Sequence, residues 1–158
     1  MSAVVQTPDL NIRPMTRDDI DAVMDIELSV YAYPWTKRIM VDCLRVGYRC
    51  FVGELDGTLA GYCVMSSGAG EAHILNVCVA NEFQRRGLGR LLLTTMLDEA
   101  KILSVENVFL EVRPSNFPAV TLYEQLGFNE VGTRKDYYPA KNGREDAVIL
   151  ALNISYWK

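Results

Sequence analysis

The first third of the chain carries apolar residues at helical spacing. Residues 10–13, LNIR, alternate apolar and polar residues and predict a short strand. Thr16 then stands where a helix N-cap is expected, and Asp18 and Asp19 follow in the first turn, where negative charge suits the helix dipole. The apolar positions that come next are spaced by four, four and three residues, which predicts one buried stripe of an amphipathic helix: Ile20, Met24, Leu28 and Tyr31.

A second helix is predicted after the break at 33–35. Thr36 is its expected N-cap and Gly47 its expected end. From residue 48 the pattern changes to strands. Residues 48–55 and 58–66 flank Asp56-Gly57, a strong two-residue hairpin signal. Further along, we predict strands at 72–80, 107–112, 128–138 and 146–154, helices at 88–103 and 117–126, and a turn at 141–143.

The predicted order is strand, two helices, three strands, helix, strand, helix and two strands. Hairpin-linked strands with two late β-α-β crossings indicate a mixed α/β fold, in which helices cover one mixed, mostly antiparallel sheet of about seven strands. The chain has 158 residues, of which 49% are apolar and 23% charged. This length and composition predict a single globular domain over residues 1–158.

Charge and composition exclude several classes of function. The net charge of −4 argues against a nucleic-acid-binding protein and suits a cationic partner. No stretch approaches the ~18 apolar residues of a membrane span, and residues 1–10 lack the Lys or Arg of a signal peptide, so we expect a cytoplasmic protein. The four cysteines have no C-x-x-C pair and are expected to be buried and reduced, and with one histidine, His73, we expect no metal site.

Residues 84–90, QRRGLGR, follow a predicted buried strand and open a predicted amphipathic helix. A loop that begins a helix directs several backbone N–H groups at one spot, and the helix dipole adds positive charge there. Two glycines allow a phosphate to approach the backbone, and three arginines add charge: Gly87, Gly89, Arg85, Arg86 and Arg90. The segment could cradle a diphosphate, although a solvated basic turn could have the same sequence.

Two other phosphate-binding loops can be compared with this segment. The P-loop string G-x-x-x-x-G-K-[ST] does not occur in the chain. A dinucleotide fingerprint needs a small third residue where Leu92 stands, although Glu111 lies about where a ribose-binding acid is expected. The long antiparallel region before the loop disfavours the dinucleotide interpretation.

Residues 110–128, LEVRPSNFPAVTLYEQLGF, provide the second motif. Together with Q-x-x-G-x-G at 84–89, this segment resembles the GCN5-related N-acetyltransferase superfamily, in the strand–loop–helix order of those enzymes. Five shorter runs are similar to the bacterial members that acetylate the N-terminal alanine of a small-subunit ribosomal protein: 33–36, 75–77, 110–116, 135–139 and 145–147. Thr36 and Asp136 depart from the usual residues of that group, and Asp136 could alter peptide preference.

The resemblance implies acetyl-CoA as the acetyl donor. It also implies which residues bind this cofactor: Val77, Cys78, Val79, Arg85, Arg86, Gly87, Leu88, Gly89, Arg90 and Asn116. Asn116 also suits the N-cap of the helix that begins at Phe117. The peptide substrate is expected to be walled by Tyr33, Trp35, Tyr137 and Tyr138, each of which could equally be a packing residue.

Direct acetyl transfer needs a base for the amine and an acid for the leaving thiolate. The resemblance assigns the base to Glu111, which alternation places opposite Leu110 and Val112 on its strand, and we expect either burial of this carboxyl group or a water relay. It assigns the acid to Tyr123. A phenol of pKa near 10 protonating a thiolate of pKa near 8.5 is uphill by about 1.5 units, or ~2 kcal/mol. Alternatively, Glu111 could be a solvent-exposed strand residue without a catalytic role, and Tyr123 an aromatic residue that only packs against its neighbours.

These residues predict an enzyme that acetylates the N-terminus of a ribosomal protein, without direct contact to nucleic acid or membrane, as a monomer or weak dimer. Two other functions stay open. One is acetylation of lysine side chains or of a small-molecule amine. The other is a non-catalytic module that binds acyl-CoA and regulates a partner.

Overall fold

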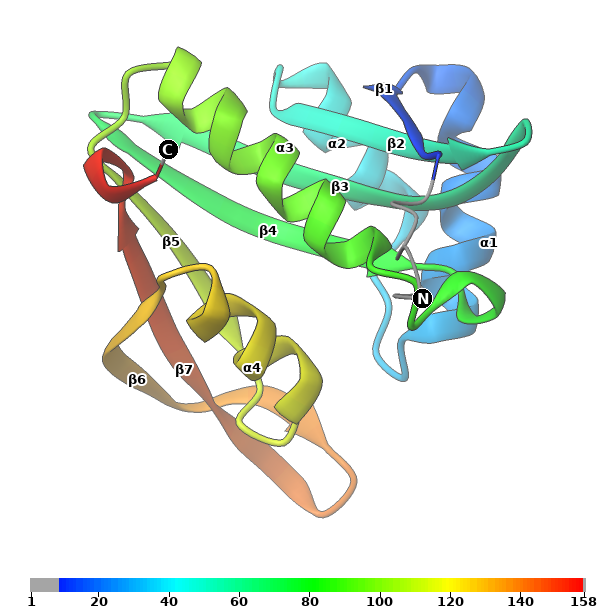
Figure 1. Ribbon diagram of the computed structural model, residues 1–158. Coiled ribbons are helices and arrows are strands. Elements are labelled where there is room, and N and C mark those ends of the chain that lie inside the picture. Colours follow the sequence, from blue (N-terminus) through cyan, green and yellow to red (C-terminus); the bar gives the residue numbers. More distant parts are fainter. Residues whose placement is uncertain (1–8, 158) are drawn as a thin grey trace, which may run out of the picture. The chain divides into compact units, whose positions relative to one another are not determined.

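The computed structural model describes residues 9–157, so most of the first ten residues, on which the expectation about a signal peptide rests, lie outside the described part. Within residues 9–157 the strands form one sheet of order β1-β2-β3-β4-β5-β7-β6. The strands are β1 (Asn11–Pro14), β2 (Arg49–Leu55), β3 (Thr58–Gly68), β4 (Glu71–Val79), β5 (Asn107–Val112), β6 (Asn129–Ala140) and β7 (Gly143–Asn153). The α-helices are α1 (Ile20–Val30), α2 (Lys37–Arg45), α3 (Leu88–Ile102) and α4 (Phe117–Gln125) (Figure 1).

The predicted fold class is confirmed. Strands β4 and β5 pair in parallel, as a β-α-β crossing through α3 requires. The pairs β1–β2, β5–β7 and β6–β7 are antiparallel. The sheet is therefore mixed and mostly antiparallel, in the element order that the hydrophobic pattern predicts.

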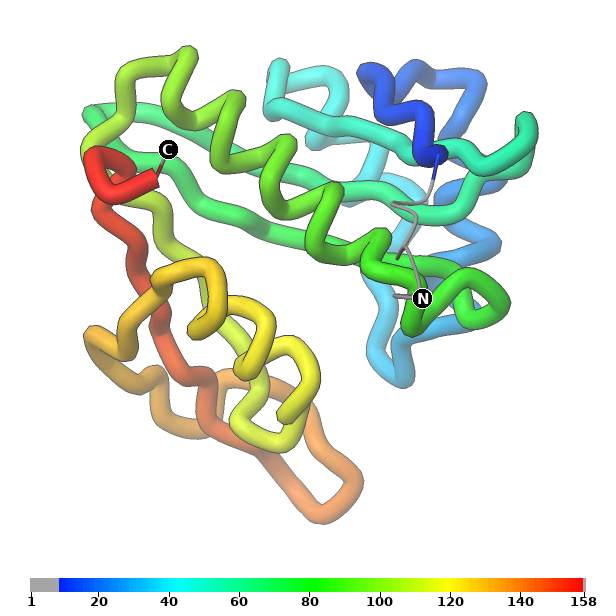
Figure 2. The backbone as a smooth tube through the Cα atoms, in the orientation of Figure 1, coloured from blue at the N-terminus to red at the C-terminus, as the bar shows by residue number. Residues whose placement is uncertain are grey.

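The chain divides into two compact units, which are described separately. Within the described residues, the first contains 9–64 and 76–94, and the second contains 65–75 and 95–157. Strands β3 and β4 and helix α3 each contribute to both units. Figure 2 follows the backbone through each unit in chain order.

The core of the first unit lies between α1, α2 and the strands of its sheet. Its fully buried members include Val23, Met40, Val52 and Tyr62. The hairpin between β2 and β3 turns at Asp56-Gly57, where both residues have positive φ (50° and 79°), as a two-residue turn of this type requires. The predicted cysteine burial is also confirmed, because all four thiols are free and buried.

The predicted stripe of α1 is wrong at one position. Leu28 is 60% exposed, whereas Glu27 is 1% exposed. An α-helix turns by about 100° per residue, so Leu28, eight residues after Ile20, is rotated by about 80° from it and Glu27 by only about 20°. The buried face therefore runs through Ile20, Val23, Met24 and Glu27, and a carboxylate occupies a core position.

The second helix begins and ends as the sequence predicts. The hydroxyl oxygen of Thr36 accepts a hydrogen bond from the Ile39 N–H at 3.2 Å, and Gly47 follows the helix with φ +84°. The first helix has a short 3₁₀ turn, Arg17–Asp19, between its cap residue Thr16 and Ile20. The backbone N–H of Thr16 donates to Oδ2 of Asp19 at 2.7 Å.

The second unit is built on β5, β7 and β6. Alternation along β5 buries Val108, Leu110 and Val112 and leaves Glu111 on the opposite face, as predicted. A simple second β-α-β crossing would place β6, the strand that follows α4, directly beside β5. The structure differs from this arrangement. Strand β7 pairs with both β5 and β6 and separates them.

Candidate active site

Residues 84–90 follow β4 and the 3₁₀ turn Asn81–Phe83 in the first unit, and the last three of them open α3. Arg85 (φ +65°) and Gly87 (φ +79°) both have left-handed backbone, which bends the loop before the helix begins at Leu88. A Cβ atom at Gly87 would meet nothing within 4 Å, so the glycine faces open space and serves the backbone conformation. The side-chain amide of Gln84 donates to the Val79 carbonyl at 3.0 Å and ties the loop to the end of β4.

The arginines of this loop lie at the surface. Arg85, Arg86 and Arg90 are exposed, and the guanidinium of Arg86 lies 5.5 Å from the centre of the Phe83 ring. Leu88 is buried and anchors the first turn of α3 in the core. Exposed positive charge beside a helix N-terminus can hold a phosphate group, so the described residues fit the predicted diphosphate cradle.

Strand β4 changes its pairing before the predicted acetyl-binding residues. Its ladder with β5 covers Glu71–Ile74. Farther along, the Cys78 carbonyl faces β3, since a Cβ at Gly61 would lie 2.6 Å from it. Because successive residues of a strand direct their polar groups to opposite edges, Val77 and Val79 direct theirs to the other edge. The Val77 carbonyl accepts from the Tyr31 hydroxyl at 2.9 Å.

Glu111 is surrounded by polar groups in the second unit. Its Oε1 atom accepts from Nε of Arg134 at 2.8 Å, and the carboxyl side chain is 22% exposed. Interaction with the same carboxylate is the main reason that the pKa of Tyr137 is raised. The guanidinium of Arg134 lies 5.7 Å from the centre of the Tyr137 ring.

Two further phenols belong to this part of the second unit. Burial raises the pKa of Tyr123 to about 12. Burial also raises the pKa of Tyr138, with smaller contributions from the charge of Glu111 and from Tyr123. The structure thus brings together three of the predicted residues, Glu111, Tyr137 and Tyr138, while Tyr123 has only a small electrostatic effect on Tyr138.

A bulge in β6 presents the two adjacent tyrosines. The register of β6 with β7 shifts between Arg134 and Tyr138, and Asp136 within the shift has φ +52°. The backbone N–H of Asp136 donates to Oδ1 of Asp146 at 2.9 Å, which fixes the bulge to β7. The rings of Tyr137 and Tyr138 then meet edge to face, with centroids 4.9 Å apart.

Arg113 and Glu145 connect the start of α4 to the β6–β7 hairpin. The guanidinium of Arg113 donates to the Pro139 carbonyl at 2.8 Å and lies 4.4 Å from the centre of the Tyr138 ring. Glu145 accepts from the Ser115 N–H and hydroxyl, both at 3.0 Å, and its pKa is lowered mainly by the Ser115 hydroxyl. Next along the chain, Asn116 caps α4 by accepting from the Ala119 N–H at 3.4 Å, as the helix-cap alternative predicts.

The remaining predicted residues, Tyr33 and Trp35, lie in the loop between α1 and α2 in the first unit. Tyr33 is 49% exposed. The backbone N–H of Trp35 donates to Oε2 of Glu27 at 2.8 Å. Sequence reasoning missed Glu27, although one signal was available: a charged residue seven positions after Ile20 falls on the apolar face of the predicted helix.

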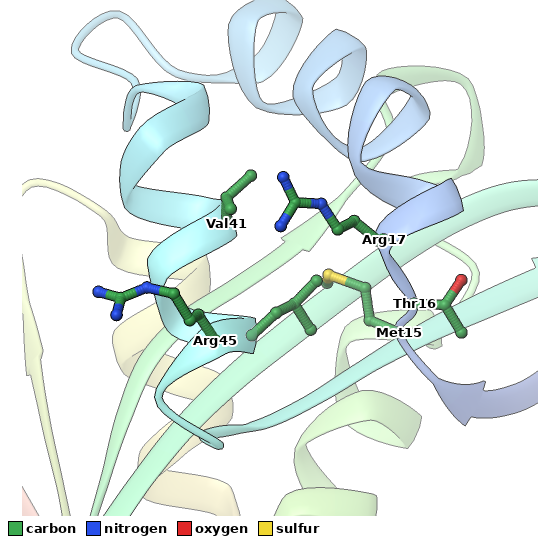
Figure 3. A pocket seen from close by; sticks show the side chains of 6 residues that line it. Met15, Thr16, Arg17, Val41 and Arg45 are labelled. Atoms are coloured by element: carbon green, nitrogen blue, oxygen red, sulfur yellow. The ribbon is translucent and has the colours of Figure 1, made fainter.

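A separate pocket of about 340 Å³ lies in the first unit and contains none of the predicted site residues. It is lined by Met15, Thr16, Arg17, Val41, Leu44 and Arg45 (Figure 3). Among the described residues, no group of three or more His, Cys, Asp or Glu side chains is arranged to hold a metal ion. No helix in the described part of the chain is long and apolar enough to cross a membrane.

Known proteins resemble the chain over most of its length. The family model of the acetyltransferase (GNAT) family matches residues 20–128. The [ribosomal protein bS18]-alanine N-acetyltransferase of Escherichia coli K12, an enzyme of the RimI type, is 39% identical over 144 residues, which cover 91% of this chain and 97% of that protein.

Solved structures agree with this relationship. The crystal structure of the ribosomal-protein-S18-alanine N-acetyltransferase from Escherichia coli superposes with a TM-score of 0.87 at 38% identity, covering 92% of this chain and 94% of that chain. The fold is also that of Salmonella typhimurium yncA, solved with its cofactor acetyl-CoA, at a TM-score of 0.78 and 21% identity over 92% of this chain and 94% of that chain. These matches confirm the predicted family: the chain belongs to the GNAT acetyltransferases.

Proposed function

We propose that this protein transfers the acetyl group of acetyl-CoA to the N-terminal amine of a protein, with the alanine terminus of a small-subunit ribosomal protein as its substrate. One observation carries this choice of substrate. The chain is 39% identical, over 91% of its length, to an enzyme named for the bS18 alanine terminus. The net charge of −4 suits a cationic substrate of this kind.

The loop Gln84–Arg90 holds the diphosphate of acetyl-CoA in this proposal. The first-turn N–H groups of α3 and the exposed arginines supply hydrogen bonds and positive charge. The ladder between β4 and β5 ends at Ile74. Beyond that point, the N–H groups of Val77 and Val79 face the same edge of β4. Either group can donate to the thioester carbonyl and stabilise the negative charge that develops on its oxygen.

Glu111 acts as the base, and the polar surroundings of its carboxylate favour a water relay over direct transfer. An α-amine has a pKa near 7.7–8.0, so about a tenth of it is neutral at pH 7. The Glu111 side chain is 22% exposed and its Oε1 is held by Arg134, so water can reach the carboxylate. The nitrogen forms its bond to the acetyl carbon and gives up its proton through water to Glu111.

Tyr123 supplies the proton that the sulfur takes when the carbon–sulfur bond breaks. Its pKa of about 12 keeps the phenol protonated at neutral pH. Transfer to a thiolate of pKa near 8.5 is then uphill by about 3.5 units, or ~5 kcal/mol, more than an unperturbed Tyr would require. Tyr123 therefore acts first by donating a hydrogen bond to the leaving sulfur, and the proton follows as the negative charge develops.

A peptide with N-terminal Ala and one internal Lys, incubated with the protein and acetyl-CoA, tests the proposal by tandem mass spectrometry. We expect one acetyl group, on the α-amine. Acetylation of the lysine alone would keep the enzyme class and overturn the substrate. An unmodified peptide, with turnover of small amines or with acetyl-CoA binding alone, would overturn the N-terminal assignment and favour one of the two other functions.

A further inference from the structure

The buried carboxylate of Glu27 joins three elements of the first unit. Its Oε1 atom accepts from the Tyr62 hydroxyl at 2.6 Å and from the side-chain amide of Asn76 at 2.9 Å. Its Oε2 atom accepts from the Trp35 N–H at 2.8 Å. Tyr62 lies on β3 and Asn76 on β4, whereas Trp35 lies in the loop before α2. One side chain of α1 thereby holds two strands and one loop.

Burying a carboxylate is costly unless hydrogen bonds compensate for the lost water. Glu27 is 1% exposed and lies on a helix face whose other members are Ile20, Val23 and Met24. Packing alone would be served by a leucine or methionine at this position. All three hydrogen bonds reach neutral donors on other elements, so the carboxylate fixes the places of those donors.

The first consequence concerns the loop between α1 and α2. Residues 31–36 have no regular secondary structure, and Pro34 has no N–H to donate. The Trp35 N–H is bound to Glu27, and the next residue, Thr36, begins the cap of α2. The backbone between Tyr33 and Thr36 is therefore fixed at Trp35 from within the core, while Tyr33 remains 49% exposed and can contact a substrate.

The second consequence concerns β4. The Asn76 oxygen accepts from the Tyr31 hydroxyl at 3.1 Å, and the same hydroxyl lies 2.9 Å from the Val77 carbonyl oxygen. In a strand, the N–H and the carbonyl of one residue point to the same edge. Tyr31 therefore fixes the strand edge that also carries the Val77 N–H, one of the two donors proposed for the thioester carbonyl.

We propose that Glu27 is a positioning residue that aligns the peptide-binding loop at Trp35 with the acetyl-binding edge of β4 at Val77. This inference rests on the proposed function for its substrate. It assigns Glu27 no contact with substrate or cofactor, and its effect passes through Trp35 on one side and through Asn76 and Tyr31 on the other.

Glu27→Gln tests the inference because glutamine has the same size but one acceptor oxygen. Whichever way the amide turns, its NH₂ group faces a donor, either the Trp35 N–H or the pair formed by Tyr62 and Asn76. We expect the KM for the peptide to rise about tenfold, the Kd for acetyl-CoA to stay within about twofold, and the Trp35 amide to exchange its hydrogen at least about tenfold faster.

Tyr62→Phe is the matched control, because it removes one donor to Oε1 and leaves the Trp35 bond intact. We expect it to leave the peptide KM and the Trp35 exchange rate within about twofold of the parent protein. Should Glu27→Gln not fold, Glu27→Met removes both acceptors while filling the same space, and the same measurements apply to it.

The outcomes separate this inference from the proposed function. A parent protein that leaves the peptide α-amine unmodified overturns the proposed function, and hydrogen exchange at Trp35 then decides alone whether Glu27 fixes the loop. A variant that lowers thermal stability and active fraction but keeps the parent KM and Trp35 exchange rate overturns the positioning role. The positioning role is also overturned if the variant raises the Kd for acetyl-CoA by as large a factor as the KM for the peptide.

Discussion

The Nε atom of Arg134 lies 2.8 Å from Oε1 of Glu111, although β7 separates the strands that carry the two residues. The ion pair fixes one carboxylate oxygen of Glu111, the proposed base, while the Glu111 side chain remains 22% exposed. Glu111→Gln keeps the size and one acceptor oxygen but cannot take up a proton. We expect kcat to fall by roughly 10²–10⁴-fold, the range for loss of a general base.

Steady-state kinetics and calorimetric titration of acetyl-CoA measure this effect. The Kd for acetyl-CoA should stay within about twofold, since Glu111 is not among the residues assigned to the diphosphate. Glu130→Gln, an exposed carboxylate on β6, is the matched control and should retain the parent kcat. A Glu111→Gln enzyme as fast as the parent would remove Glu111 from the mechanism.

Tyr123→Phe removes the proposed acid and keeps the ring, whose centroid lies 5.9 Å from that of Phe128. We expect a fall in kcat of roughly 10²-fold with unchanged acetyl-CoA binding. Because burial raises the pKa of Tyr123 to about 12, the acid stays protonated until the pH rises through that value. The parent enzyme should therefore show no loss of kcat from this group up to about pH 10.

The exposed Tyr156 provides the control for this substitution. Tyr156→Phe should match the parent in kcat at every pH. An alkaline fall in kcat near pH 9 that disappears in Tyr123→Phe would contradict the raised pKa. Equal kcat values for Tyr123→Phe and the parent would contradict the acid role itself.

The elements that local rules determine were predicted well from the sequence. Asp56-Gly57 specifies the β2–β3 turn because both residues adopt positive φ, and the strand at 107–112 has the predicted bounds. The site depends more on contacts between distant residues. Arg134 reaches Glu111 across β7, and Asp146 fixes the bulge at Asp136, so neither contact follows from spacing along one strand.

Glu27 shows a different limit of sequence reasoning. Counting apolar residues alone follows Ile20, Met24 and Leu28, although a strict spacing of four drifts by about 40° per step around a helix. The burial of a charged side chain depends on donors from other elements, and here the three donors lie eight, 35 and 49 residues farther along the chain. No local pattern contains that information.

Asp19 gives the first unit a stability that depends on acid pH. The Arg13 guanidinium holds both carboxylate oxygens at 2.8 Å and lowers the pKa of Asp19 to about 2. A carboxyl group whose pKa is depressed in the folded state stabilises it above the unfolded pKa near 3.9, and this contribution is lost as the pH falls from about 4 to about 2. The contribution at pH 7 is up to about 2 kcal/mol.

Asp19→Asn should therefore lower the free energy of unfolding by up to about 2 kcal/mol at pH 7 and by almost nothing near pH 2, in urea titrations at both pH values. The amide oxygen can still accept from the Thr16 N–H, so the helix cap is kept. The neighbouring exposed Asp18 is the control, and Asp18→Asn should change stability little at either pH. A pH-independent loss in Asp19→Asn would contradict the ion-pair origin.

The bulge at Asp136 provides a test of how the peptide wall is held. Asp146→Ala removes the acceptor of the Asp136 N–H, which leaves the left-handed residue without its partner on β7. Because the bulge presents Tyr137 and Tyr138, we expect the peptide KM to rise about five- to tenfold, as the loss of one hydrogen bond implies, with acetyl-CoA binding unchanged.

Asp146→Asn keeps an acceptor oxygen at the same place and should restore the KM to within about twofold of the parent. Steady-state kinetics with the Ala-terminated peptide measure both. If the alanine variant kept the parent KM, or if the asparagine variant were equally impaired, the hydrogen bond would not be what aligns these two rings.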